Sequence, residues 1–130
     1  ALVPFVEHQE LMTDWDALRG MYAFAIWAAR KQGMFFARDP YGIKPLYIAD
    51  DGRTLRFASQ VKALLAGGKI DTTADPAGHA GFFLWGSVPE PFTLYTAIRA
   101  LPAGASLWVG RSGARTERRH FDLAEILRAA

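Results

Sequence analysis

Three charged residues in one short stretch, Arg38, Asp39 and Lys44, are the side chains best placed for chemistry in this chain. A guanidinium can pair with a carboxylate, and charge-assisted hydrogen bonds of this kind can hold a loop in place. A turn is predicted from Asp39 to Gly42, because proline at its second position fixes φ and glycine allows positive φ. Two prolines and one glycine make the connection rigid: Pro40, Gly42 and Pro45.

Other residue types that commonly perform chemistry are absent or dispersed. The chain has no cysteine, which excludes disulfides, cysteine-based metal sites and a thiol nucleophile within its 130 residues. The three histidines, His8, His79 and His120, are far apart and lack the spacing of metal ligands. We therefore expect no metal site and no cofactor bound by these residues.

Four arginines gather late in the chain, and two interpretations are open for them. A basic patch of this kind can bind nucleic acid or phosphate. Without interleaved aromatic residues it is more often a solvated loop and strand end, and this second interpretation is favoured, so we expect no nucleic-acid partner. The four residues are Arg111, Arg115, Arg118 and Arg119.

The composition is that of a folded domain. Of the 130 residues, 51% are hydrophobic and 22% are charged, which suits one domain with a sizeable core and excludes a disordered chain. No apolar run approaches the roughly 20 residues of a membrane span, and no secretory signal opens the sequence. We expect a cytoplasmic protein without a membrane partner.

The first half of the chain predicts an antiparallel sheet that carries the charged stretch. Large and small residues alternate over 22–28, which predicts a strand with large side chains on one face and small ones on the other. A helix is expected before this strand, and it should end at Gly20. The central strand positions are apolar on both alternating sides, which indicates that helices cover at least one face of the sheet. A meander of four strands is expected at 22–28, 34–38, 46–49 and 55–58.

The second half predicts helices and further strands. Ser59 is a good N-cap for a helix over 60–65, and Asp75 followed by proline opens a helix that runs to about Leu84. The aromatic cluster in and after this helix, Phe82, Phe83 and Trp85, is expected in the core, with a face for a partner domain as the alternative. The remaining segments are a helix or turn at 93–98, a turn at 101–104, strands at 106–109 and 116–121, and a short helix or linker at 122–130.

Five segments of the chain resemble one family. Residues 36–47, Phe-Ala-Arg-Asp-Pro-Tyr-Gly-Ile-Lys-Pro-Leu-Tyr, are similar to the signature loop of class II glutamine amidotransferase domains, above all those of glutamine-hydrolysing asparagine synthetases. Residues 18–27, Leu-Arg-Gly-Met-Tyr-Ala-Phe-Ala-Ile-Trp, resemble the strand that precedes this loop. The further matching segments, in family order, are 57–65, 86–91 and 98–104.

The resemblance implies an α+β fold, specifically part of the four-layer αββα fold of the N-terminal-nucleophile hydrolases. It implies a glutaminase in which an N-terminal cysteine attacks the amide of glutamine, with the free α-amino group as base. The released ammonia then amidates aspartate in a synthetase domain that uses ATP and magnesium. That domain, glutamine and aspartate are the implied partners, and a homodimer is possible.

The sequence departs from this family pattern where catalysis is concerned. It begins with Ala1, and the family's glutamine-binding motifs upstream of the Leu-Arg-Gly-Met segment are not found in residues 1–17. No catalytic and no glutamine-binding residue is therefore assigned in this chain, which is expected to be inactive by itself. Residues 1–121 are interpreted as the C-terminal portion of a glutaminase domain, and residues 122–130 as the start of a linker toward the synthetase domain.

The signature loop is expected to have a structural or domain-interface role. In the structural interpretation, which is favoured, Asp39 caps the turn, Arg38 pairs with a carboxylate and Lys44 is solvated. The alternative makes these charges part of the wall between the glutaminase site and the ammonia route. An alternative for the whole chain is a non-catalytic glutaminase-like module that supports an amide ligase. The loop residues are Arg38, Asp39, Gly42, Lys44 and Pro45.

Overall fold

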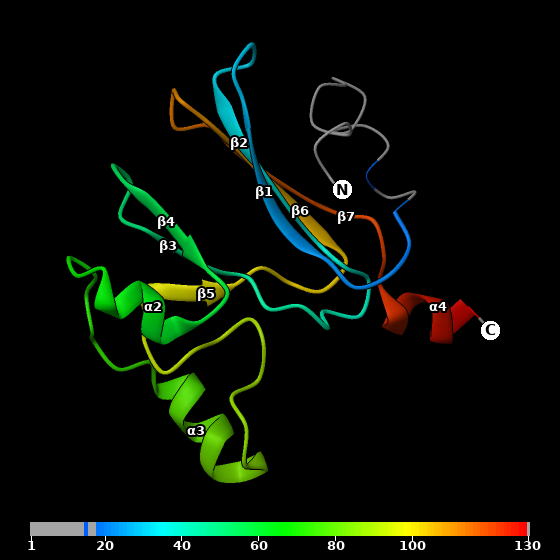
Figure 1. Cartoon of the computed structure of the whole chain (residues 1–130). Coiled ribbons are helices and arrows are strands. Elements are labelled where there is room, and N and C mark those ends of the chain that lie inside the picture. The colour runs from blue at the N-terminus through cyan, green and yellow to red at the C-terminus, as the bar shows by residue number, and fades with distance from the viewer. Residues whose placement is uncertain (1–14, 16–17, 130) are drawn as a thin grey trace. The chain divides into compact units, whose positions relative to one another are not determined.

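The structure is a computed structural model that describes Trp15 and residues 18–129 (Figure 1). The chain divides into two compact units: one is formed by residues up to Ile43 together with those from Ala103 onward, and the other comprises Lys44–Pro102. The helix expected before Gly20 falls mostly outside the described residues, although Gly20 has the positive φ, 108°, that a chain-reversing glycine adopts.

The first unit is built on a four-stranded antiparallel sheet with the order β1-β2-β6-β7. Its core contains Trp15, Phe35 and Ala37, with Tyr22, Phe24 and Trp108 packed against them. β1 and β7 are the edges of this sheet among the described residues. The strands are β1 (Ala23–Ala28), β2 (Gly33–Arg38), β6 (Ala105–Gly110) and β7 (Arg115–Arg119), and the helix α4 (Leu123–Ala129) follows.

The second unit has a three-stranded antiparallel sheet with the order β4-β3-β5 and two helices. Ala49, Leu64 and Ile98 are buried together and join the helix α2 to the sheet. The elements are β3 (Tyr47–Asp50), β4 (Leu55–Ala58), α2 (Val61–Ala66), α3 (Pro76–Trp85) and β5 (Ile98–Ala100).

The expected four-stranded meander is wrong, although all four of its strands exist. β1 and β2 belong to one sheet and β3 and β4 to another, because β2 pairs with β6 and β3 pairs with β5. Both pairings join segments far apart in the sequence, and local hairpin signals carry no information about them. The α+β class with antiparallel sheets is as expected, whereas the four-layer αββα arrangement remains a prediction.

The two helices of the second unit begin in different ways. The side chain of Asp75 accepts hydrogen bonds from the backbone amides of Ala77 and Gly78, so the predicted N-cap of α3 is confirmed. The predicted Ser59 cap is wrong: α2 begins after Gln60, whose side chain makes no cap. α2 is instead held by the packing of Leu64 in the core.

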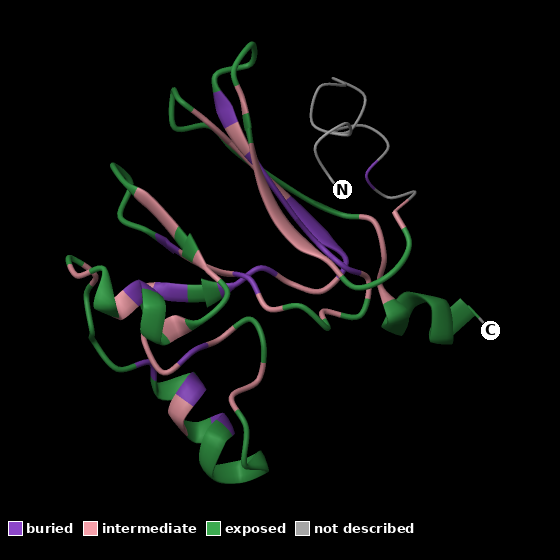
Figure 2. Cartoon of the chain, in the orientation of Figure 1, coloured by how far each residue is buried: buried purple, intermediate pink, exposed green. Residues whose placement is uncertain are grey.

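The aromatic end of α3 contradicts the expected core packing. Phe83 and Trp85 are 83% and 69% exposed, and Phe82 and Leu84 are exposed as well. Figure 2 shows this end of the helix in the colour of exposed residues. The buried side of α3 is made by glycines, since an added Cβ at Gly78 would lie 1.9 Å from the carbonyl oxygen of Thr93. Small residues therefore give this helix its close packing, and its large ones face outward.

Residues 93–98 form a turn without helix, one of the two expected outcomes. The buried hydroxyl of Thr93 organises it, because it lies 2.9 Å from the carbonyl oxygens of both Tyr95 and Ile98 and can donate its one proton to either. The amide of Tyr95 donates back to the same hydroxyl at 3.1 Å. In the first unit, β6, β7 and α4 lie close to where the sequence predicts strands and a short helix.

Candidate functional site

The signature loop buries two charged side chains at its start. Arg38 and Asp39 are 2% and 1% exposed, at the point where β2 ends. One carboxylate oxygen of Asp39 accepts from the amides of Tyr41, at 3.2 Å, and Ile43, at 3.0 Å. An Nη of Arg38 donates to the carbonyl oxygen of Gly42 at 2.7 Å. Asp39 thus caps the predicted turn through the amides of Tyr41 and Ile43, and Arg38 binds the carbonyl oxygen of Gly42 at the end of the turn.

Backbone hydrogen bonds fasten this turn to the rest of the first unit. The amide of Asp39 donates to the carbonyl oxygen of Tyr22 at 2.8 Å, and its own carbonyl accepts from Gly104 at 2.9 Å. Gly42 has a φ of 64°, and a Cβ on it would lie 3.1 Å from both the Ala103 Cβ and an Arg38 guanidinium nitrogen. Glycine is therefore required here for conformation and for space.

The five predicted loop residues do not all belong to one unit. Arg38, Asp39 and Gly42 are brought together in the first unit, as just described. Lys44 and Pro45 begin the second unit, with Lys44 exposed and Pro45 half-buried. The structure therefore divides the motif into a buried anchor and a solvent-facing continuation.

A cavity of about 560 Å³ adjoins the buried anchor. Tyr41 lines it and packs edge-on against Phe121, with ring centroids 5.3 Å apart. The backbone amide of His120 donates to the carbonyl oxygen of Gly104 at 2.9 Å, which brings the end of β7 to the loop. The residues lining the cavity are Leu18, Arg19, Gly20, Met21, Asp39, Pro40, Tyr41, Ile43, His120 and Phe121.

Sequence reasoning missed His120 and Phe121 as neighbours of the loop. No local pattern marks them, because they reach it only through the antiparallel pairing of β6 with β7. His120 packs against the indole of Trp15, with ring centroids 3.9 Å apart. This histidine is therefore part of the aromatic packing of the unit.

The described residues contain no group of three or more side chains that could hold a metal ion. His79 is turned to its own helix, where its Nδ1 lies 2.9 Å from the carbonyl oxygen of Asp75. His8 lies outside the described residues.

Three of the four late arginines contact other residues of the first unit. Arg119 pairs with Asp122 at 2.6 Å, Arg115 donates to the carbonyl oxygen of Gly113 at 2.6 Å, and Arg111 donates to the Gln32 side chain at 3.1 Å. Arg118 does not join them and lines a separate cavity in the same unit.

The chain belongs to the glutamine amidotransferase domain family, whose sequence profile matches residues 8–121. It is 41% identical over 90 residues to a putative glutamine-hydrolysing asparagine synthetase of Mycobacterium bovis, covering 67% of this chain and 14% of that protein. It is 34% identical over 104 residues to the glutamine-hydrolysing asparagine synthetase 1 of Bacillus subtilis, and the match covers 80% of this chain and 16% of that protein. A shorter match, 43% over 51 residues, covers 39% of this chain and 8% of the amidase chry2 of Gibberella zeae.

The chain spans less than a fifth of the length of these curated relatives. Within the described residues, no helix is long and apolar enough to cross a membrane.

Proposed function

We propose that this chain is the C-terminal part of a glutaminase domain in an asparagine synthetase. Glutamine and water would give glutamate and ammonia there, and the ammonia would amidate aspartate in a synthetase domain of the same polypeptide. The family match over residues 8–121 carries this proposal, together with the names of its relatives. The buried, hydrogen-bonded anchor of the signature loop supports it, because the motif builds a defined structure.

The nucleophile of this reaction has to come from outside these residues. The chain contains no cysteine, and none of its residues is assigned a catalytic or glutamine-binding role. ATP and magnesium would likewise be bound by the synthetase domain.

We assign the two parts of the signature loop different tasks. The anchor residues Arg38, Asp39 and Gly42 keep the end of β2 in one conformation, since buried charges persist only where their hydrogen bonds are satisfied. Lys44 is exposed, and we assign it a place facing the neighbouring domain. In this scheme Lys44 helps to keep ammonia on its route, and Asp39 maintains the fold.

The test is made on the complete gene product that encodes this chain. Glutamate release from glutamine and asparagine formation are measured together, and their ratio reports how much ammonia reaches aspartate. Lys44→Ala is expected to leave glutamate release unchanged and to lower that ratio about twofold or more, the effect of losing one exposed charge contact. Lys62→Ala, an exposed lysine on α2, is the matched control. An unchanged ratio in Lys44→Ala would remove the assignment of Lys44.

A complete product without glutaminase activity, and without a cysteine nucleophile, would instead favour the second candidate. In that case the chain is part of a non-catalytic module that supports an amide ligase by packing against it. The exposed aromatic end of α3 is the observation that favours such a packing role.

A further inference from the structure

One face of the first unit's sheet carries a cavity of about 510 Å³ that the glutaminase assignment does not use. Phe35 lies opposite Trp108 in the β2–β6 register, and Thr116 lies opposite Trp108 in the β6–β7 register. Ser106 and Arg118 form the next matched pair on the same face.

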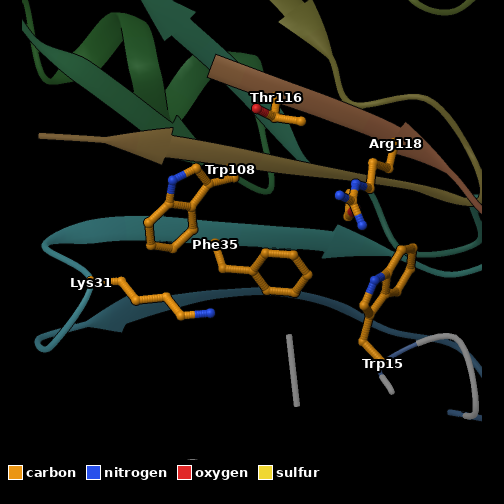
Figure 3. Close-up of a pocket in the computed structure, with 7 residues that line it drawn as sticks. Trp15, Lys31, Phe35, Trp108, Thr116 and Arg118 are labelled. Atoms are coloured by element: carbon orange, nitrogen blue, oxygen red, sulfur yellow. The ribbon is translucent and has the colours of Figure 1, made fainter. Parts of the chain in front are cut away.

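Trp15 closes one side of this cavity, with its ring centroid 6.1 Å from that of Phe35. Figure 3 shows Lys31, from the β1–β2 turn, beside these residues.

The cavity is walled by aromatic rings that are held in place. Phe35 and Trp15 are 4% and 5% exposed. The indole of Trp108 lies over Gly33, where an added Cβ would come within 2.3 Å of the ring. Only glycine at position 33 leaves room for this ring. The sheet surface therefore offers flat apolar walls for a planar molecule.

The polar groups that line the cavity are hydrogen-bond donors or can act as donors, and two of them are cations. Lys31 and Arg118 contribute the charges, and no carboxylate is among the described residues that line the cavity. Ser106 is 3% exposed and lines the cavity, where its hydroxyl can donate a hydrogen bond.

Neighbouring charges in the described part of the chain do not neutralise this donor set. No ion pair joins Lys31 or Arg118 to a described carboxylate, whereas Arg119 on the same strand is paired with Asp122. Residues alternate across a strand, so Arg118 and Arg119 point to opposite faces. The face that carries the aromatic rings is the one with the uncompensated positive charge.

We propose that this cavity binds a small planar carboxylate, with its ring system between the aromatic walls. The carboxylate accepts hydrogen bonds from the Arg118 guanidinium and the Ser106 hydroxyl, and Lys31 adds a second cation. A bidentate guanidinium–carboxylate contact suits this arrangement, because the guanidinium presents its donors in one plane. The site is separate from the signature loop, so it stands whether or not the chain serves a glutaminase.

The test is a titration of the 130-residue chain with 2-naphthoate, followed by the indole N–H signals in ¹H–¹⁵N NMR spectra. The chain has four tryptophans, which serve as two reporters and two internal controls. Trp15 and Trp108 line the cavity, whereas Trp27 and Trp85 do not and are exposed. Saturable shifts are expected for Trp15 and Trp108 alone. The neutral isostere 2-naphthalenemethanol should bind at least about fivefold more weakly, since it lacks the charge.

Two variants that each remove one positive charge test whether Arg118 and Lys31 contribute to the binding of 2-naphthoate. Arg118→Gln and Lys31→Gln are each expected to weaken 2-naphthoate binding about fivefold, and added salt should weaken it further. Arg115→Gln is the matched control, because it removes the same charge from the opposite face of β7. The proposal is overturned if no indole signal shifts, if all four shift alike, if the alcohol binds equally well, or if both Gln variants retain full affinity.

Discussion

The signature loop and the end of α3 reverse the usual distribution of polar and apolar residues. In the loop, Arg38 and Asp39 are almost completely buried, whereas at the end of α3 Phe83 and Trp85 are mostly exposed. The buried charges are held by backbone partners that are a few residues away in the sequence. The exposed aromatics have no such constraint, because the packing side of α3 is made of glycines. Hydropathy therefore decides burial in neither region: local hydrogen bonds hold the charges of the loop inside, and close packing at glycines leaves the aromatic residues of α3 outside.

The largest effect is expected from Asp39→Ala. This change leaves the amides of Tyr41 and Ile43 without their acceptor and removes a buried charge from beside Arg38. The free energy of unfolding should fall by about 3 kcal/mol or more, as measured by urea denaturation. Asp39→Asn keeps a side-chain oxygen and should lose less. An unchanged melting temperature in Asp39→Ala would show that the loop is not fixed by this cap.

A smaller loss is expected at the beginning of α3. Asp75 caps the helix and lies 3.4 Å from Arg99, but Arg99 is about half exposed and can be solvated when the partner is lost. Asp75→Ala should therefore cost about 1–2 kcal/mol, the usual effect of removing an N-cap. Asp75→Asn, which retains the capping oxygen, should be close to wild type in the same denaturation experiment. Equal losses in the two variants would assign the effect to charge and not to capping.

Asp51 provides the exposed counterpart of Asp39. In the β3–β4 turn its carboxylate accepts from the amides of Thr54 and Arg53 and from the Arg56 side chain, and these bonds lower its pKa below the ordinary value of 3.8. A lowered folded-state pKa stabilises the protein above about pH 4, and this contribution is lost as the pH falls through the folded-state pKa.

Asp51→Asn should therefore reduce stability slightly at pH 7 and not at all at the acidic end of a pH series of thermal melts. Asp71→Asn is a comparison in another loop, since hydrogen bonds from Thr73 also lower the pKa of Asp71. A loss in Asp51→Asn as large as that in Asp39→Ala would show that burial does not determine how much stability is lost when a capping carboxylate is removed.

The smallest change in stability is expected at the exposed aromatic end of α3. Phe83 is 83% exposed, so Phe83→Ser should alter the free energy of unfolding by no more than about 0.5 kcal/mol. The same variant should reduce the binding of an apolar dye to the folded chain, since it removes part of an exposed patch. Phe36→Ser, at a fully buried position, is the destabilising control. A large loss of stability in Phe83→Ser would show that the ring is buried in solution.

The features predictable from sequence are those that depend on neighbouring residues. The turn from Asp39 to Gly42 and the Asp75 cap with its following proline both formed as predicted. The division into two sheets was not predictable in this way, because the partners of β2 and β3 come from β6 and β5. The same reason hid His120 and Phe121, which reach the loop through strand pairing.

The exposure of the α3 aromatics was missed for a different reason. Phe82, Phe83 and Trp85 have the composition of a core segment, and their neighbours Gly78 and Gly81 look like weak points of a helix. In the structure these glycines are the contact surface, where a Cβ would meet Thr93 and Pro89. In α3, burial therefore follows the close approach of Thr93 and Pro89 to the two glycines, and not the hydrophobicity of the side chains.

The two edges of the four-stranded sheet differ in their tendency to accept another strand. All five residues of β7 are exposed and four of them are charged, which discourages pairing with a further chain. β1, Ala-Phe-Ala-Ile-Trp-Ala, carries no charge and pairs only with β2 among the described strands. Of the two edges among the described strands, β1 is therefore the one at which a further strand would pair more readily.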